Sequence, residues 1–220
     1  CIIKVKNTGR NIKPMFIDAW SEIERYKYCI HMHTKKTVTN KSKEYGRGWL
    51  ESIIYRMTAA DQLAQAVNLM EEQNKIGMIV PKPYEQCAKY SLGWAGNYKK
   101  AMNILNKYIN DCRIYKEEIS EQLYKPLVFP VGGMMIFRTQ ALAQCAKWVR
   151  NNQYLVDINE PLPGQSYLHG IERLMVIFIE MTGYNWCLID CTQEKKSKFW
   201  HNTDHGVSCI KSEKEIYQRL

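Results

Sequence analysis

The sequence predicts an α/β domain in which a largely parallel sheet is flanked by helices. Short apolar runs alternate along the chain with longer segments whose apolar residues recur at helical spacing. A composition of 45% hydrophobic and 24% charged residues is that of an ordinary globular protein, and 220 residues suffice for one domain with a full core. No apolar segment approaches the roughly 20 residues that a membrane-spanning helix requires.

Strand and helix signals succeed each other in the first part of the chain. We expect a strand at 2–5, a helix at 14–25, a strand at 28–33, helices at 49–57 and 59–73, and a strand at 76–80. Pro14 suits the first turn of its helix. The polar stretch 34–48 contains Gly46 and Gly48, so we expect a mobile loop there that could close over a ligand.

The second half of the chain continues this alternation. We expect an inserted helical region at 86–123, a strand at 134–138, a helix that Thr139 caps, a helix at 166–182 and a strand at 184–189. The composition turns polar after Cys191. We therefore divide the chain into a domain at 1–191 and a C-terminal tail at 192–220.

The net charge of the chain indicates which kinds of binding partner to expect. A formal net charge of +9 favours anionic partners such as nucleotide diphosphates, nucleic acid or a membrane surface. The lysines and arginines are spread along the sequence instead of forming one basic tract, so we do not expect a nucleic acid. The eight cysteines sit within apolar patterns and follow no signal peptide, which favours a reducing, cytoplasmic location.

Polar residues follow the apolar strand predicted at 28–33. A buried strand places its continuation at the carboxyl edge of the sheet, where open α/β folds bind their ligands. The residues that we expect to meet an anionic group there are His33, Thr34, Lys35 and Lys36. His31 shares a face of the strand with His33, and we interpret it as a core histidine.

Two glycine-containing turns could also contact a ligand. Gly9 lies between a predicted strand and a helix whose free N–H groups could support a phosphate or sugar hydroxyl, and Arg10 could make a bidentate contact. An ordinary strand-to-helix turn is the alternative. Gly132 and Gly133 precede a strand and lack side chains, so a ligand could approach the backbone there. A tight turn or bulge is the alternative.

A predicted helix carries three residues with acid–base chemistry. His169, Glu172 and Arg173 are three and four residues apart, so they share one face. A carboxylate between histidine and arginine has the properties of a general base, because such neighbours tune its pKa. A surface salt-bridge cluster is the alternative.

A rival site lies at the carboxyl end of the chain. Residue types found at zinc sites occur there, at Cys187, Cys191, His201, His205 and Cys209. On a strand, however, Cys187 and Cys191 would lie about 13 Å apart, at roughly 3.3 Å per residue, which is too far to share an ion. A helix carrying the other three residues could still bind metal.

Four segments, in this order and with these strand and helix contexts, resemble the rhamnan synthesis protein F family of bacterial polysaccharide glycosyltransferases: 7–14, 33–36, 129–138 and 169–174. The resemblance implies a GT-A-like nucleotide-sugar fold whose first strands precede Cys1. It also implies transfer of a sugar, with dTDP-rhamnose as the expected donor, to a lipid-linked glycan of a cell wall or O-antigen. Such an enzyme would act in the cytoplasm and could associate with the inner face of the cell membrane.

The same resemblance implies roles for individual residues. It implies that the donor is bound by Gly9, Arg10, His33, Thr34, Lys35 and Lys36. It implies that the acceptor is bound by Gly132, Gly133 and Arg173. Glu172, with His169, takes the place of the base that deprotonates the acceptor hydroxyl in an inverting displacement. Asn11 stands where the family usually has aspartate.

The resemblance also bears on metal dependence. GT-A enzymes usually hold Mn²⁺ or Mg²⁺ through an Asp-x-Asp motif at the place of residues 33–36, and this sequence has no acidic pair there. Our hypothesis is that the fixed charges of Lys35 and Lys36 replace the metal in stabilising the departing nucleoside diphosphate.

Two other functions stay open. A non-catalytic module could hold an anionic polymer or a partner enzyme through its basic loop and the tyrosine-rich insert. A nucleic-acid module would use interleaved aromatic and basic residues, although helix packing explains the aromatics more simply. These residues are Tyr84, Tyr90, Trp94 and Tyr98 with Lys89, Lys99 and Lys100.

Overall fold

The protein is described by a computed structural model that covers residues 2–5, 11–33, 40–58, 61–84, 93–94, 96–114, 127–156, 166–191, 197–203 and 206–207. The helices are η1 (Pro14–Asp18), α1 (Trp20–Ile23), α2 (Asn40–Thr58), α3 (Gln62–Glu72), α5 (Tyr98–Cys112), η4 (Val131–Gly133), α6 (Thr139–Asn151), η5 (Gln153–Leu155) and α7 (Tyr167–Met181). The strands are β1 (Tyr28–His31), β2 (Ile76–Pro81), β3 (Met135–Arg138), β4 (Asn185–Cys191), β5 (Ser197–Thr203) and β6 (Gly206–Val207).

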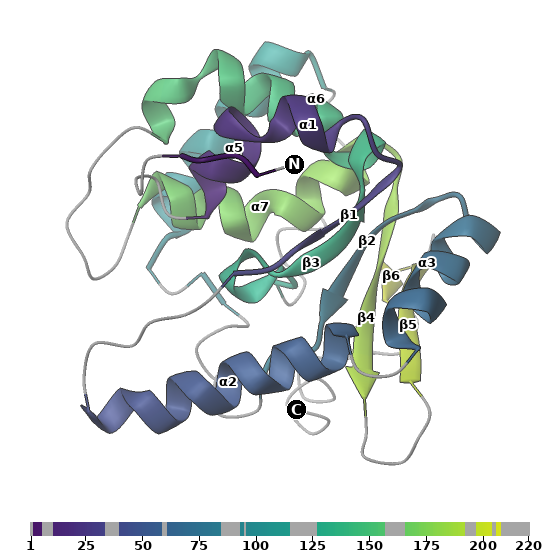
Figure 1. Cartoon of the computed structure of the whole chain (residues 1–220). Helices are drawn as coiled ribbons and strands as arrows, with labels where there is room; N and C mark the ends of the chain where they lie inside the picture. Colours follow the sequence, from purple (N-terminus) through teal and green to yellow (C-terminus); the bar gives the residue numbers. More distant parts are fainter. Residues whose placement is uncertain are drawn as a thin grey trace.

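The strands within these ranges form a mixed sheet in the order β1-β3-β2-β4-β5-β6 (Figure 1). Only β2 and β4 pair in parallel among these neighbours, and the other pairs are antiparallel. The predicted α/β class is therefore confirmed, whereas the prediction of a largely parallel sheet is wrong. The error concerns strand direction, which apolar periodicity does not report.

The position of β3 explains this difference. β3 lies between β1 and β2 and runs opposite to both, so β1, β2 and β4 still point in one direction. The chain leaves the carboxyl end of β2 and comes back to the same edge of the sheet before β3 begins. As a result, the amino end of β3 lies beside the carboxyl ends of its neighbours, and His31 of β1 is directly opposite Met135 of β3.

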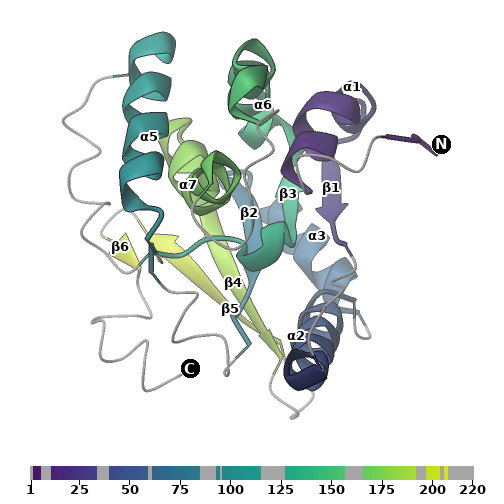
Figure 2. The same ribbon diagram turned by 90° about the vertical axis from the view of Figure 1, so that its left-hand side faces the viewer.

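Helices cover both faces of this sheet (Figure 2). Residues of the central strands alternate between two buried clusters, as the period of a strand requires. One cluster, under η1, α1, α5, α6 and α7, takes Met78, Val80, Met135 and Phe137. The other, under α2 and α3, takes Ile79 and Ile136. In the described part of the chain no helix is long and apolar enough to cross a membrane.

Helix α2 starts earlier than the sequence predicted. The predicted loop at 34–48 is wrong for residues 40–48, which belong to α2, while residues 34–39 lie outside the described ranges. Gly48 stands in this helix where it passes close to Tyr84. A Cβ at Gly48 would lie 2.9 Å from the Tyr84 hydroxyl oxygen, so the glycine permits close packing and does not mark a loop.

Two further predictions differ from the structure, one of a strand and one of a helix cap, and the structure adds a strand that was not predicted. Residues 2–5 form no strand, and Ile2 is 97% exposed. Thr139 does not cap α6, because its hydroxyl instead donates to the Tyr26 carbonyl oxygen at 2.6 Å. Part of the polar region beyond Cys191 extends the sheet, since β5 pairs with β4 in antiparallel fashion. Backbone pairing needs no apolar side chains, which is why composition alone did not reveal β5.

Helix α5 lies within the region that we predicted as an insert, and it belongs to the main core. Its buried residues pack against α6 and α7, and they are Ala101, Ile104, Leu105, Tyr108 and Ile109. The Tyr108 ring lies 4.5 Å from the ring of Phe178 and 5.4 Å from that of Trp148, measured between centroids. Burial raises the pKa of Tyr108 well above its ordinary value, so the hydroxyl stays protonated.

The buried hydroxyl of Tyr108 allows a prediction about the stability of the fold. Among the described residues it has no hydrogen-bond partner, although it is fully buried. A buried polar group without a partner costs about 1–3 kcal/mol, so Tyr108→Phe is expected to raise the free energy of unfolding by about 1 kcal/mol. Urea denaturation measures this change, with Tyr154→Phe as a control because Tyr154 is 56% exposed. A loss of stability in Tyr108→Phe would contradict the prediction.

Candidate functional site

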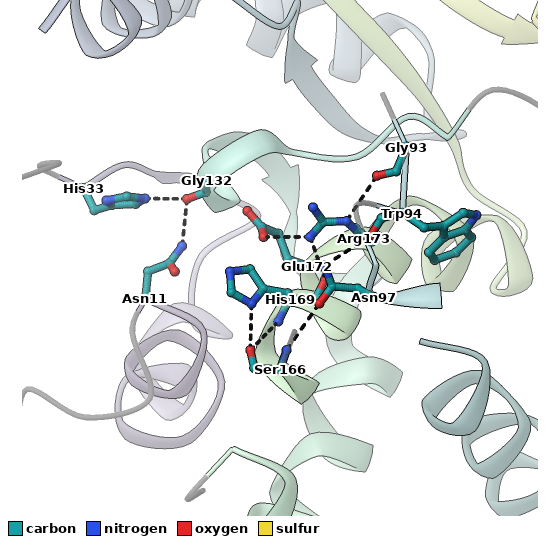
Figure 3. Close-up of polar contacts among 10 residues, drawn as sticks. All are labelled: Asn11, His33, Gly93, Trp94, Asn97, Gly132, Ser166, His169, Glu172 and Arg173. Carbon is teal, nitrogen blue, oxygen red and sulfur yellow. Dashed lines mark hydrogen bonds and ion pairs between the residues drawn. The ribbon is translucent and has the colours of Figure 1, made fainter. Parts of the chain in front are cut away.

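The candidate site lies where the carboxyl end of β1 meets the amino end of β3. The antiparallel pairing of these strands brings His31 and His33 beside η4, although each histidine is about a hundred positions away from η4 in the sequence. The first half of α7 contacts η4 from the other side (Figure 3). The prediction that the polar continuation of this strand lies at an edge shared with other carboxyl ends is confirmed for His33.

The turn Gly132–Gly133 is held by side chains from two other segments. The Gly132 carbonyl oxygen accepts from Asn11 Nδ2 at 2.8 Å and also from His33 Nε2. The Gly133 carbonyl oxygen accepts from His31 Nδ1 at 2.5 Å. We call Asn11, His31 and His33 the turn clamp. His33 already donates Nε2–H to the Gly132 carbonyl oxygen, so the predicted phosphate contact would use Nδ1, which donates only when the ring carries both protons.

Both glycines of this turn are required by geometry. Their φ angles are +74° at Gly132 and +73° at Gly133, in the left-handed region that residues with a Cβ rarely adopt. A Cβ would also lie 2.6 Å from Trp49 at Gly132 and 2.2 Å from Asn11 at Gly133. The tight turn that we weighed as an alternative is therefore present, and an acceptor contact of these glycines stays a prediction.

The two histidines of the clamp stand on one face of the sheet, with ring centroids 6.3 Å apart. Burial lowers the pKa of His31, the bond to the Gly133 carbonyl opposes this shift, and the charge of a protonated His33 adds to it. His31 is therefore neutral at pH 7, with Nδ1 carrying the proton that it donates. This agrees with our interpretation of His31 as a histidine whose hydrogen bonding is satisfied within the fold.

Asn11 explains part of the clamp's chemistry. An amide can donate to the Gly132 carbonyl oxygen, whereas a carboxylate can only accept hydrogen bonds. An aspartate in the same orientation would set two acceptor oxygens against each other. Asn11, which stands where we expected an aspartate, therefore acts as a hydrogen-bond donor in this chain.

The amino end of α7 carries the predicted acid–base residues. Ser166 is the N-cap, and its Oγ accepts the backbone N–H of His169 at 3.2 Å. The same Oγ lies 2.8 Å from Nδ1 of the His169 ring. The hydroxyl can donate its own proton to Nδ1, which would leave Nε2 as the protonated nitrogen of a neutral ring.

Glu172 and Arg173 lie one turn further along α7. Glu172 Oε2 is 3.7 Å from Nη1 of Arg173, and their side chains are 14% and 9% exposed. The Arg173 guanidinium also donates to the His169 carbonyl oxygen at 3.2 Å and stacks over the Phe129 ring at 4.8 Å. Burial lowers the pKa of Arg173 and the nearby Glu172 opposes the shift, but arginine remains charged. Glu172 is thus a partly buried carboxylate beside a fixed positive charge.

The structure adds a residue that sequence reasoning missed. Asn97 is 2% exposed, and its amide joins two segments: Nδ2 donates to the Trp94 carbonyl oxygen at 3.1 Å, and Oδ1 accepts from the Ser166 N–H at 3.2 Å. Arg173 Nε donates to the Gly93 carbonyl oxygen at 3.3 Å. An asparagine just before a helix was the only sequence signal, and it points to a cap and not to a contact across the fold.

The predicted site residues therefore divide into two groups. One group is described and gathers around η4 and the amino end of α7: His33, Gly132, Gly133, His169, Glu172 and Arg173. The other group lies outside the described residues: Gly9, Arg10, Thr34, Lys35 and Lys36. The structure gives Arg173 a buried, bracing position, and its predicted acceptor contact stays a prediction.

The rival zinc site has no support in the described ranges. His201 lies on β5 directly opposite Cys187 of β4, so the helix predicted for His201 is wrong, and His205 and Cys209 lie outside the described residues. Burial raises the pKa of the Cys187 thiol to about 12, which disfavours the thiolate that zinc binds. Across the described ranges, no three His, Cys, Asp or Glu residues come together as a metal site would require.

Comparison with known proteins decides the family. The model of the family described as rhamnan synthesis protein F matches residues 1–184. This chain belongs to that family. The rhamnan synthesis protein F match includes every described residue of the candidate site, from the turn clamp to Arg173 on α7. No curated protein and no solved structure matches the chain.

Membership of the rhamnan synthesis protein F family gives a role in rhamnan synthesis and hence in the biosynthesis of a polysaccharide. The family resemblance noted in the sequence is thereby confirmed.

Proposed function

We propose that this chain is a glycosyltransferase domain that moves a sugar, expected to be rhamnose, from a nucleotide-diphosphate donor to a growing cell-wall or O-antigen polysaccharide. The observation that carries the proposal is Glu172, a partly buried carboxylate held beside Arg173 on α7, which contacts the Gly132–Gly133 turn. A rhamnan is a polymer of rhamnose, so the family supports this choice of sugar.

Glu172 supplies the base in this proposal. An acceptor hydroxyl becomes a better nucleophile as its proton is removed, and a carboxylate within hydrogen-bond reach can take that proton. The oxygen then attacks the anomeric carbon as the bond to the diphosphate breaks, and a single direct displacement inverts the configuration there. His169 and Arg173 orient the carboxylate and the acceptor on the same face of α7.

The donor is proposed to lie on the β1 side of the site. β1, β2 and β4 point in one direction, so their carboxyl ends meet at a single edge, where α/β folds bind nucleotides. This arrangement supports a GT-A-like domain. His33 is anchored to the Gly132 carbonyl oxygen, and Thr34, Lys35 and Lys36 follow it in the chain. In this proposal the charges of Lys35, Lys36 and Arg10 stabilise the departing diphosphate, and Thr34 and the Gly9 backbone donate hydrogen bonds to it.

A metal-held diphosphate does not fit the residues present. No acidic pair follows β1 in the sequence, and the described residues contain no cluster of metal-binding type. In this proposal the fixed charges of Lys35 and Lys36 take the place of Mn²⁺ or Mg²⁺ at the diphosphate. The proposal extends to a lipid-linked glycan as acceptor and to action at the inner face of the cell membrane, to which a net charge of +9 would be attracted.

Calorimetric titration tests the donor side of the proposal. We expect the protein, with any natural upstream segment included, to bind dTDP-rhamnose in the presence of EDTA. Changing Lys35 and Lys36 together to alanine is expected to weaken binding by about a hundredfold or more, since charge-assisted contacts contribute about 1.5–3 kcal/mol each. Lys99→Ala together with Lys147→Ala, on α5 and α6, is the control for lost net charge.

The opposite results would change the proposal. Binding that needs added manganese and survives loss of both lysines would refute the metal-independent role of Lys35 and Lys36. Absence of binding to dTDP-rhamnose, UDP-sugars and free nucleotides, with EDTA and with manganese, would favour a non-catalytic module that holds an anionic polymer or a partner enzyme.

A further inference from the structure

Two aromatic side chains stand beside the candidate site without a role in the proposed chemistry. The rings of Trp94 and Tyr98 meet edge to face, with centroids 5.5 Å apart. Trp94 packs partly against the main core, but Tyr98 is 52% exposed at the start of α5. Helix packing therefore explains Trp94 in part and does not explain Tyr98. We call this pair the aromatic ledge.

The ledge is fixed relative to Glu172 by hydrogen bonds on both sides of Trp94. Arg173, the ion-pair partner of Glu172, donates to the carbonyl oxygen of Gly93. Asn97 donates to the carbonyl oxygen of Trp94 and also accepts the N–H of Ser166 at the start of α7 (Figure 3). The same arginine thus holds both the candidate base and the segment that bears the ledge.

There is room next to this segment. A Cβ placed on Gly93 would have no neighbouring atom within 4 Å, whereas one placed on Gly132 or Gly133 would meet side chains closer than 3 Å. The backbone at Gly93, next to Trp94, is therefore not covered by packed side chains at that position.

We propose that the aromatic ledge binds a sugar ring of the acceptor glycan, one or more units away from the ring whose hydroxyl reacts. This inference rests on the proposed function, because it takes the acceptor side of the site to face α7. An aromatic face stacks on the apolar C–H face of a pyranose, and a tyrosine or tryptophan adds a polar tip for the hydroxyl rim. A 6-deoxyhexose suits such a surface especially well, because its methyl group replaces a hydroxymethyl group.

A nucleobase is the rival occupant, since bases also stack on aromatic rings. Single-stranded nucleic acid would need cations that track a phosphate backbone beside the rings. Lys99 is exposed next to Tyr98, but Lys100 lies over the ring of Tyr167 at 5.5 Å, where cation–π attraction holds it. Lys89 and Tyr90 of the nucleic-acid alternative lie outside the described residues. Among the described residues next to Tyr98, one exposed lysine does not make a backbone groove, so a neutral glycan is the favoured occupant.

The test is binding of an α-linked rhamnose tetrasaccharide, measured by titration without any nucleotide sugar. We expect Tyr98→Ala and Trp94→Ala to weaken binding by about tenfold, the scale of one lost stacking contact. Tyr98→Phe is expected to bind within about twofold of the native chain because it keeps the ring. Tyr154→Ala is the matched control, since Tyr154 is as exposed as Tyr98 but lies on η5.

Specific outcomes would overturn the inference. Equal tetrasaccharide binding by the native chain and Tyr98→Ala would overturn it. So would a loss of tetrasaccharide binding in Tyr154→Ala as large as that in Tyr98→Ala. A third such outcome is a Tyr98→Ala variant that loses binding of oligouridylate but keeps binding of the tetrasaccharide. Tyr98 is exposed, so its alanine variant keeps the fold even if Trp94→Ala does not. Because the titration contains no donor, the inference fails separately from the proposed function: Glu172→Gln could retain activity while Tyr98 still governs binding of the tetrasaccharide.

Discussion

Changing Glu172 to glutamine is expected to abolish sugar transfer while leaving donor binding intact. Glutamine keeps the size of the side chain and an oxygen that Arg173 can contact, but it cannot accept the proton of the acceptor hydroxyl. General-base catalysis contributes a factor of about 100 to 10,000 to a rate, so the rate of transfer at saturating acceptor should fall by that factor. The measurement is release of nucleoside diphosphate from dTDP-rhamnose in the presence of acceptor.

A matched control lies on the same helix. Glu180 is two turns beyond Glu172 on α7, and its Oε1 accepts from Trp186 Nε1 at 2.8 Å, away from the turn clamp. Glu180→Gln removes the same charge from the same helix and is expected to keep full transfer activity. If Glu172→Gln were as active as Glu180→Gln, Glu172 would have no part in the chemistry, and the non-catalytic module would become the better hypothesis.

Much of the fold could be predicted because its helices bury one face. α6 follows its strand where the sequence predicted a helix, and its buried residues recur at helical spacing, among them Ala141, Leu142, Cys145, Trp148 and Val149. α7 begins and ends within one residue of the predicted range, because Ser166 caps it and Gly183 follows its end with a φ of +81°. Caps and periodicity are local signals, which explains why they succeeded for these two helices.

What the sequence did not reveal is set by contacts between distant segments. The direction of β3 depends on its pairing with β1 and β2, and its own residues are equally apolar in either direction. Gly48 resembles a loop residue until Tyr84 is seen to pack against it. In both cases the deciding partner is more than thirty positions away, outside any window in which periodicity is read.

The candidate site shows the same division. Its residue types at the end of β1 and on α7 were visible as local patterns, and the described ones lie around one turn of the chain. The bonds that arrange them were not visible, since Asn11 reaches Gly132 across 121 positions and Asn97 reaches Ser166 across 69. A side-chain amide has no periodicity that would indicate such a partner. The sequence therefore predicted which residue types form the site, but it did not predict the hydrogen bonds that hold them in place.

The Gly132–Gly133 turn leads to the largest expected effect on stability. Gly133→Ala is expected to lower the free energy of unfolding by about 3 kcal/mol, from two sources. A φ of +73° costs a residue with a Cβ about 1–2 kcal/mol, and overpacking typically costs about 1–3 kcal/mol more. The overpacking arises because the new Cβ would lie 2.2 Å from Asn11 Nδ2. The same nitrogen donates the hydrogen bond to the Gly132 carbonyl oxygen.

Alanine substitutions at two other glycines, measured by urea denaturation, separate the backbone cost from the overpacking cost. Gly183 has a φ of +81° but nothing within 4 Å of its Cβ position, so Gly183→Ala should cost only the backbone part, about 1 kcal/mol. Gly93 has open space and no positive φ, so Gly93→Ala should change stability by less than about 0.5 kcal/mol. If Gly133→Ala cost no more than Gly183→Ala, Asn11 would move aside freely, and the turn clamp would not hold this corner of the site in place.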